Sequence, residues 1–276
     1  MRWILKRLFR ERRRIGVVAI FTFLGGYFAF FRSQAVLYGV PFPIVSGLAF
    51  MVGLTAFLAA IVILFPKIRH VAESVALSVP VLSLMGMFSQ PDQGGLSTSA
   101  GIYGLLLCYL FAVVYGSNLL DRYLPQRPRS FRSLATSFLQ PKALWPYLAL
   151  TPESDTKYRS EKTLAIDWIE PGVRFRVVDR SGELAKIEEI QTISEVKPHQ
   201  HYAFDFEVPD ATEKSPVSSG RKEIWLKPQG PKTTLESVRT FDRVTIRAQI
   251  LLWLDDAMGR LDDEVILAAE ALERRE

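Results

Sequence analysis

The sequence predicts a chain in two parts: an α-helical transmembrane bundle of four spans, and an α+β domain in which a seven-stranded antiparallel curved sheet is followed by a long C-terminal helix. Three observations lead to this fold class. Long runs without charged residues lie almost wholly before residue 121. After that point apolar and polar residues alternate, as in half-buried strands. The residues from 244 to 274 repeat their apolar positions with the period of a helix.

The apolar half is predicted to cross a membrane four times. Spans near 14–31, 44–65, 73–90 and 101–120 each have roughly the twenty residues that a helix needs to cross about 30 Å of hydrocarbon. Basic residues gather before the first span, between the second and third, and after the fourth. By the positive-inside rule this predicts an integral membrane protein, of a bacterial inner membrane, with both termini in the cytoplasm. The alternative is a signal peptide cleaved after "SQA" at 33–35, which leaves the C-terminal half on the same side.

These spans carry little that could do chemistry. An ionisable residue inside a membrane usually marks a transport path or a catalytic site, and Glu73 alone comes close, at the edge of its span. In the fourth span Gly104, Cys108, Ala112 and Gly116 recur at every fourth residue and form one smooth face. We therefore predict an anchor whose partners are membrane lipids and, through that face, another helix.

The rest of the chain divides into a basic tether at 121–132 and a cytoplasmic domain at 133–276, after the membrane domain at 1–120. The domain starts with a short strand, "SLATSF", and a small helix in "PKALWPYLAL". Six strand-like stretches follow, namely "KTLAIDW", "VRFRVVD", "AKIEEIQTISEV", "HYAFDFEV", "RKEIWLK" and "TTLESVRTF". Turn residues such as "EPG", "DRSG" and "PQGP" separate them.

This order of elements resembles the helix-grip domains of the START and polyketide-cyclase (SRPBCC) superfamily. The resemblance covers residues 133–276 and also rests on the phrases "SFLQPKALWPYLALTPES", "EPGVRFRV" and "TTLESVRTFDR". A PH-like barrel also has seven strands followed by a helix, but it has no helix after its first strand.

The resemblance implies a hydrophobic pocket between the sheet and the last helix, because members of this superfamily bind lipids, sterols or polyketides, and some are enzymes. Its predicted wall is the apolar side of the strands and the helix: Trp168, Phe175, Tyr202, Phe204, Phe206, Trp225, Leu254 and Met258. The alternative is that these side chains simply fill a hydrophobic core.

The stretch "WLDDAMGRLDDEV" at 253–265 invites comparison with an aspartate-rich magnesium motif. On a helix, however, equivalent acids seven residues apart stand about 10.5 Å apart along the axis, too far to share one metal ion. The helical phase gives an apolar stripe of Leu251, Leu254, Met258, Leu261, Val265, Ala268 and Leu272. It turns Asp256, Asp263 and Glu270 away from the stripe and puts Asp255, Asp262 and Glu273 at its border. We therefore predict a gripping helix with a solvated acidic back and no metal.

Other polar residues offer weaker candidates for chemistry. His199 and His201 could face one side of a strand, but zinc needs a third and usually a fourth ligand, and none lies nearby. Asp205 and Glu207 should face water if Phe204 and Phe206 face inward; the reverse arrangement would bury two carboxylates able to act as acid or base. One of Arg174, Arg176 and Arg239 could meet an anionic head group inside a cavity.

These observations favour a membrane-anchored protein whose cytoplasmic domain binds a hydrophobic or lipid-like ligand near the bilayer. Two alternatives remain open: an enzyme of the cyclase or hydrolase kind, and a non-enzymatic membrane scaffold or regulator. The net charge of +5 is explained by basic clusters beside the spans, so we predict no nucleic-acid partner. With no phosphate loop or nucleophile elbow in the sequence, we assign no catalytic residue, metal or cofactor.

Overall fold

The computed structural model describes residues 8–64, 69–88, 106–107, 109, 111, 123–181, 185–209 and 218–274. The chain divides into two compact units, unit 1 at Met1–Leu120 and unit 2 at Asp121–Glu276.

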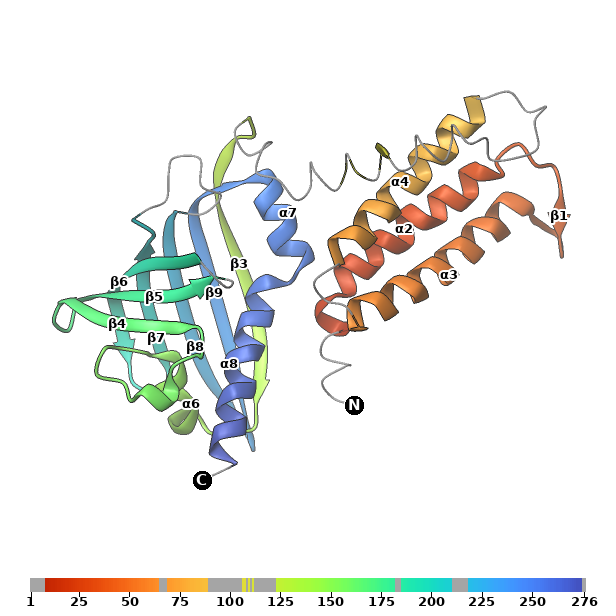
Figure 1. Cartoon of the computed structure of the whole chain (residues 1–276). Coiled ribbons are helices and arrows are strands. Elements are labelled where there is room, and N and C mark those ends of the chain that lie inside the picture. Colours follow the sequence, from red (N-terminus) through yellow and green to blue (C-terminus); the bar gives the residue numbers. More distant parts are fainter. Residues whose placement is uncertain are drawn as a thin grey trace. The chain divides into compact units, whose positions relative to one another are not determined.

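Unit 2 is built on one antiparallel sheet of seven strands in the order β3-β9-β8-β7-β6-β5-β4, which confirms the predicted sheet. The strands are β3 (Gln126–Ser137), β4 (Thr163–Glu170), β5 (Arg174–Ser181), β6 (Ala185–Lys197), β7 (His201–Glu207), β8 (Ser219–Gln229) and β9 (Lys232–Thr245). Figure 1 shows the sheet curving around the C-terminal helix.

The first strand starts earlier than predicted. β3 begins at Gln126 and pairs with β9, so most of the stretch expected to be a tether is strand. It lies at one border of the sheet, where its register shifts between Arg127 and Arg129, on either side of Pro128. A proline at such an irregularity is typical of border strands, because it removes a backbone donor.

Helices cover the concave side of the sheet. α6 (Pro141–Leu148) and the short η3 (Thr156–Tyr158) follow β3, while α7 (Ile246–Leu254) and α8 (Ala257–Glu273) close the chain. The predicted single helix at 244–274 is therefore two helices, and the break comes at Asp256, whose φ of 42° is left-handed. Aspartate is among the few residues that visit this region routinely. Thr245 starts α7 by accepting a hydrogen bond from the Ala248 amide.

The core of unit 2 lies between the concave face of the sheet and these helices. Strand β7 contributes to this core through alternate residues. Phe204 and Phe206 are 5% and 3% exposed, whereas Asp205 and Glu207 are exposed. Leu235 on β9 and Ile266 on α8 are completely buried in the same cluster.

The face that α8 presents to the sheet differs from the prediction. Asp262, Asp263 and Glu270 are 3%, 9% and 8% exposed, whereas Leu261 and Leu272 are 40% and 37% exposed. The predicted solvated acidic back is therefore wrong, and so is part of the predicted apolar stripe.

Strand β3 supplies the reason, because its inward positions carry hydroxyl groups. Ser133 Oγ donates to Asp262, and Ser137 Oγ donates to Glu270 Oε1 over 3.0 Å. The amide of Phe138 donates to the same Glu270 oxygen over 2.9 Å. Buried carboxylates are tolerated where hydrogen-bond donors meet them.

Unit 1 contains three described helices, α2 (Arg12–Ala29), α3 (Phe42–Leu64) and α4 (Arg69–Phe88), with a small hairpin of β1 (Val36–Leu37) and β2 (Val40–Pro41) before α3. Helix α2 packs against both α3 and α4. Two neighbouring glycines make this possible: a Cβ on Gly25 would lie 2.3 Å from a Val79 methyl, and one on Gly26 would lie 2.8 Å from the Ser46 carbonyl oxygen.

The predicted four-span membrane bundle is wrong. Among the described residues one helix is long and apolar enough to cross a membrane, at Phe42–Ile61. The prediction counted residues without charge, but uncharged is not the same as apolar. Helix α4 contains serines and Pro80 among its apolar residues, and its apolar part is only Ser74–Met85. That part spans only about 18 Å, less than the hydrocarbon core.

Two further expectations for this half stand as predictions. The first concerns the small-residue assembly face of Gly104, Cys108, Ala112 and Gly116, which lies outside the described residues, as does most of the fourth segment of the overturned bundle. The second is the cytoplasmic location of both termini, which follows from the basic clusters in the sequence.

Candidate functional site

Four charged side chains meet on the concave side of unit 2, each from a different element: Glu189 on β6, Lys222 on β8, Arg239 on β9 and Asp262 on α8. Strand alternation places them. Lys222 is two residues before the buried Ile224 and therefore faces inward with it. Its partners across the neighbouring strands are Phe204 and Arg239.

Arg239 is held in place from two directions. Its Nη2 donates to Glu189 Oε2 over 3.0 Å, and both side chains are about one-fifth exposed. Its guanidinium carbon lies 4.2 Å from the centre of the Phe206 ring, a cation–π distance. Glu189 in turn accepts from Gln191 Nε2 over 2.7 Å. The ion pair is therefore held by Gln191 on β6 and by Phe206 on β7.

Lys222 is different, because among the described residues its ammonium has neither an ion-pair nor a hydrogen-bond partner. Burial lowers the pKa of Lys222, and the nearby Arg239 lowers it further. Asp262 and Glu189 act in the opposite direction through their charge. The ammonium thus faces carboxylates without being bound to one.

The surroundings of this cluster are apolar and partly open. Trp168 and Phe175 meet edge to face on β4 and β5, with their ring centres 5.6 Å apart. On β6, Ile187 shares the inward face with Glu189 and is 46% exposed. Helix α8 contacts β3 and β9, so the inward face of β5 and β6 is less completely covered.

Most of the residues predicted to form the pocket wall lie on the inward side of unit 2. Tyr202, Phe204 and Phe206 lie in one buried cluster with Met258 packed against it. Phe175 and Leu254 are also buried, at 0% and 6% exposed, and Trp168 is half-buried on Phe175.

Trp225 belongs to the other face of the sheet. Ile224 and Leu226 on either side of it are in the core, so alternation turns its indole outward. There it stacks on His201, with ring centres 5.0 Å apart.

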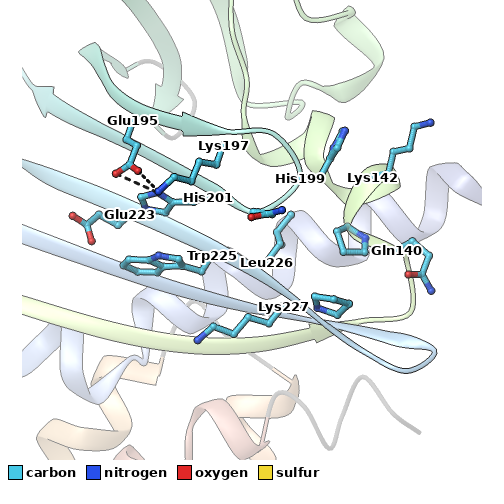
Figure 2. Close-up of a pocket in the computed structure, with 13 residues that line it drawn as sticks. Gln140, Lys142, Glu195, Lys197, His199, His201, Glu223, Trp225, Leu226 and Lys227 are labelled. Carbon is cyan, nitrogen blue, oxygen red and sulfur yellow. Dashed lines mark ion pairs between the residues drawn. The ribbon is translucent and has the colours of Figure 1, made fainter.

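Trp225 and His201 line a groove of about 940 Å³ together with residues of the β6–β7 turn and of the start of α6 (Figure 2). Its charged groups largely satisfy one another. Glu195 lies 2.7 Å from Lys197 and 3.5 Å from His201 Nδ1, and the hydrogen bond from Lys197 lowers the pKa of Glu195. Lys227 lies 2.7 Å from a carboxylate oxygen of Glu236 on the neighbouring strand β9.

The two candidate zinc ligands point to different neighbours. His199 is exposed in the turn between β6 and β7 with a left-handed φ of 63°, and its ring meets Trp145 at 5.8 Å. His201 is buried against Trp225. In the described part of the chain no group of three histidine, cysteine or acidic side chains is arranged to hold a metal ion.

The candidate acids on β7 face outward. Asp205 lies 3.8 Å from Arg221 and Glu207 lies 3.9 Å from Arg174, all partly exposed. Arg176 pairs with Asp167 at 3.1 Å on the same side. Asp205 and Glu207 therefore cannot supply acid–base chemistry inside the domain.

Sequence reasoning found Arg239 but missed Lys222, Glu189 and Asp262. Lys222 could have been found from its even spacing with Ile224 and Leu226 in "KEIWL". Asp262 could not, because its hydroxyl partner comes from the distant strand β3.

Unit 2 runs strand, helix, six strands and C-terminal helices, with the sheet open between β3 and β4. It has a helix-grip fold. The helix α6 after the first strand, together with the single open sheet, excludes the PH-like barrel.

Comparison with solved structures gives matches that cover about half of the chain. Ara h 8.0201 is 14% identical, with 54% of this chain and 99% of that chain covered and a TM-score of 0.43. A Rhizobium loti protein is 17% identical, with 54% and 98% covered and a TM-score of 0.38. A protein from Arthrobacter aurescens is 13% identical, with 51% and 86% covered and a TM-score of 0.41. No function follows from similarities this low.

No protein-family model matches the sequence, and no curated protein matches it either.

Proposed function

We propose that unit 2 binds an apolar, lipid-like ligand on the concave face of its sheet. One observation carries the proposal: the inward face of β4 and β6 keeps apolar side chains partly exposed beside an otherwise buried aromatic cluster. Ile187 is 46% exposed there, and the half-buried Trp168 stands on the buried Phe175. An apolar ligand that covers this surface gains roughly 25 cal/mol for each Å² that it removes from water.

Replacing Ile187 by asparagine tests the proposal. The polar amide would face the ligand, and we expect the affinity for a neutral fluorescent apolar probe such as Nile red to fall about tenfold, which corresponds to about 1.4 kcal/mol. The matched control is Ile190→Asn on the same strand, because three residues along a strand the side chain faces the other side.

Extraction of the purified full-length chain with organic solvent, followed by mass spectrometry, gives a second measurement. A stoichiometric apolar compound supports the proposal. Equal loss of probe affinity in the Ile187 and Ile190 variants, or probe binding that neither variant changes, contradicts it.

We also propose that α3 inserts into a bilayer and keeps unit 2 near the membrane surface. Within α3, Leu48, Val52 and Phe57 are 46%, 64% and 60% exposed, so the helix presents apolar side chains that unit 1 leaves uncovered. Twenty residues, Phe42–Ile61, correspond to about 30 Å of helix.

Val52 lies near the middle of this segment, so an arginine there should oppose insertion by about 2.5–3.5 kcal/mol. We expect the wild-type chain to resist extraction from membranes by alkaline carbonate and a large fraction of the Val52→Arg variant to be released. Val36→Arg, in the hairpin outside the helix and 62% exposed, is the control and should behave like the wild type. Release of the wild-type chain by carbonate would show that α3 is not inserted.

A further inference from the structure

We propose that the ligand of unit 2 carries a single carboxylate, which is bound by Lys222. This inference rests on the proposed function and adds the chemical class of the ligand. It follows from how the four charged groups on the concave side are satisfied.

Three of these four groups are already bound within the protein. Arg239 and Glu189 form an ion pair at 3.0 Å, and Glu189 also accepts from Gln191. Asp262 accepts from Ser133 Oγ. Lys222 remains, with three N–H donors and no ion pair or hydrogen bond among the described residues.

The position of Lys222 makes the lack of a bound partner unfavourable in the protein without ligand. Lys222 is half-buried, which removes part of the water around its ammonium, and like charges directly opposite on neighbouring strands repel. Arg239 is such a charge, because it is the cross-strand partner of Lys222 on β9. A carboxylate from outside would bind the ammonium and offset the repulsion.

The charge of the ligand follows from the same inventory. Arg239 is held by Glu189 and the Phe206 ring, so it is not available to bind a second negative charge. Asp262 and Glu189 oppose a dianion such as a phosphate monoester through their own charge. A monoanion with an apolar body fits both the single free cation among the described residues of this cluster and the apolar surface around Trp168 and Ile187.

The test compares oleate with oleyl alcohol, which has the same chain without the charge, as competitors that displace Nile red from the full-length protein. We expect oleate to bind the wild type at least tenfold more tightly. Lys222→Met should remove this preference by weakening oleate binding alone, whereas Lys222→Arg should retain most of it. Lys227→Met is the matched control, because Lys227 is on the same strand but faces outward, and it should leave the preference unchanged.

The outcomes separate the two proposals. Two outcomes would contradict the proposed carboxylate but not the proposed apolar ligand. One is equal affinity of the wild type for oleate and oleyl alcohol. The other is an equal loss of affinity for both compounds in Lys222→Met. Displacement by neither compound, in a protein shown to be folded by its circular dichroism, overturns the proposed function and this inference with it.

The preference should also depend on pH. Glu189, Arg239 and Asp262 are the charged groups that act on Lys222 from β6, β9 and α8. Because burial lowers the pKa of Lys222, its charge is lost on raising the pH earlier than that of an exposed lysine. We expect the preference for oleate to decline on the alkaline side in the wild type and to persist to higher pH in Lys222→Arg. The same decline in both would contradict the assignment to Lys222.

Discussion

Replacing Phe175 by alanine is expected to lower the free energy of unfolding of unit 2 by about 3–5 kcal/mol. Phe175 is completely buried, and its ring meets Trp168 edge to face at 5.6 Å. The substitution removes the apolar surface of the ring and leaves a cavity between β4, β5 and β6, where Phe175 is paired with Trp168 on one side and Gln191 on the other. Both effects destabilise the fold, and the edge-to-face contact adds to them.

Chemical denaturation followed by tryptophan fluorescence measures this change, because Trp168 reports on the same contact. Val173→Ala is the control, since Val173 lies in the turn before β5 and is 42% exposed, and it should change stability by well under 1 kcal/mol. A loss below about 1 kcal/mol in Phe175→Ala would mean that this position is not part of a packed core.

Replacing Asp262 by alanine should lower the free energy of unfolding of unit 2 by about 1–3 kcal/mol. Asp262 is 3% exposed, accepts from Ser133 and faces the Lys222 ammonium. The substitution leaves the Ser133 hydroxyl without its acceptor and removes one of the two negative charges that act on the Lys222 ammonium. The loss should become smaller in the double variant that also carries Lys222→Met, because the uncompensated cation is then absent.

Glu264→Ala on the same helix provides the comparison. Glu264 pairs with Lys162 at 3.3 Å, but both side chains are more than half exposed, so its loss should be within about 0.5 kcal/mol. Similar stabilities for the Asp262 and Glu264 variants, measured by thermal or chemical denaturation, would show that Asp262 is not a buried charge.

The alternation of apolar and polar residues was sufficient to predict seven strands in unit 2, their antiparallel sheet and the inward face of β7. It was also sufficient to place Trp225 outward, but the indole was assigned to the pocket wall because of its size rather than its position between Ile224 and Leu226. Size and polarity are weaker guides to a face than phase, because both faces of a half-buried strand can carry large side chains.

The face of α8 could not be predicted in the same way. Its leucines and acids each form a stripe, and the sequence of the helix alone favours burying the leucines. The choice is made by β3, which lies more than a hundred residues earlier and offers serine hydroxyls to Asp262 and Glu270. The prediction of four membrane spans failed for a different reason. Serine, threonine, glycine and proline carry no charge, yet they make a helix less apolar.

The border strand β3 has a consequence for how copies of this protein behave in solution. A strand with a free border can recruit another chain and start a growing aggregate. Here Pro128 lacks an amide donor, the pairing shifts beside it, and the neighbouring Arg127 and Arg129 are exposed. A second copy that aligned its own β3 along this border would bring its exposed arginines against those already there, so charge repulsion opposes edge-to-edge growth of the sheet at β3.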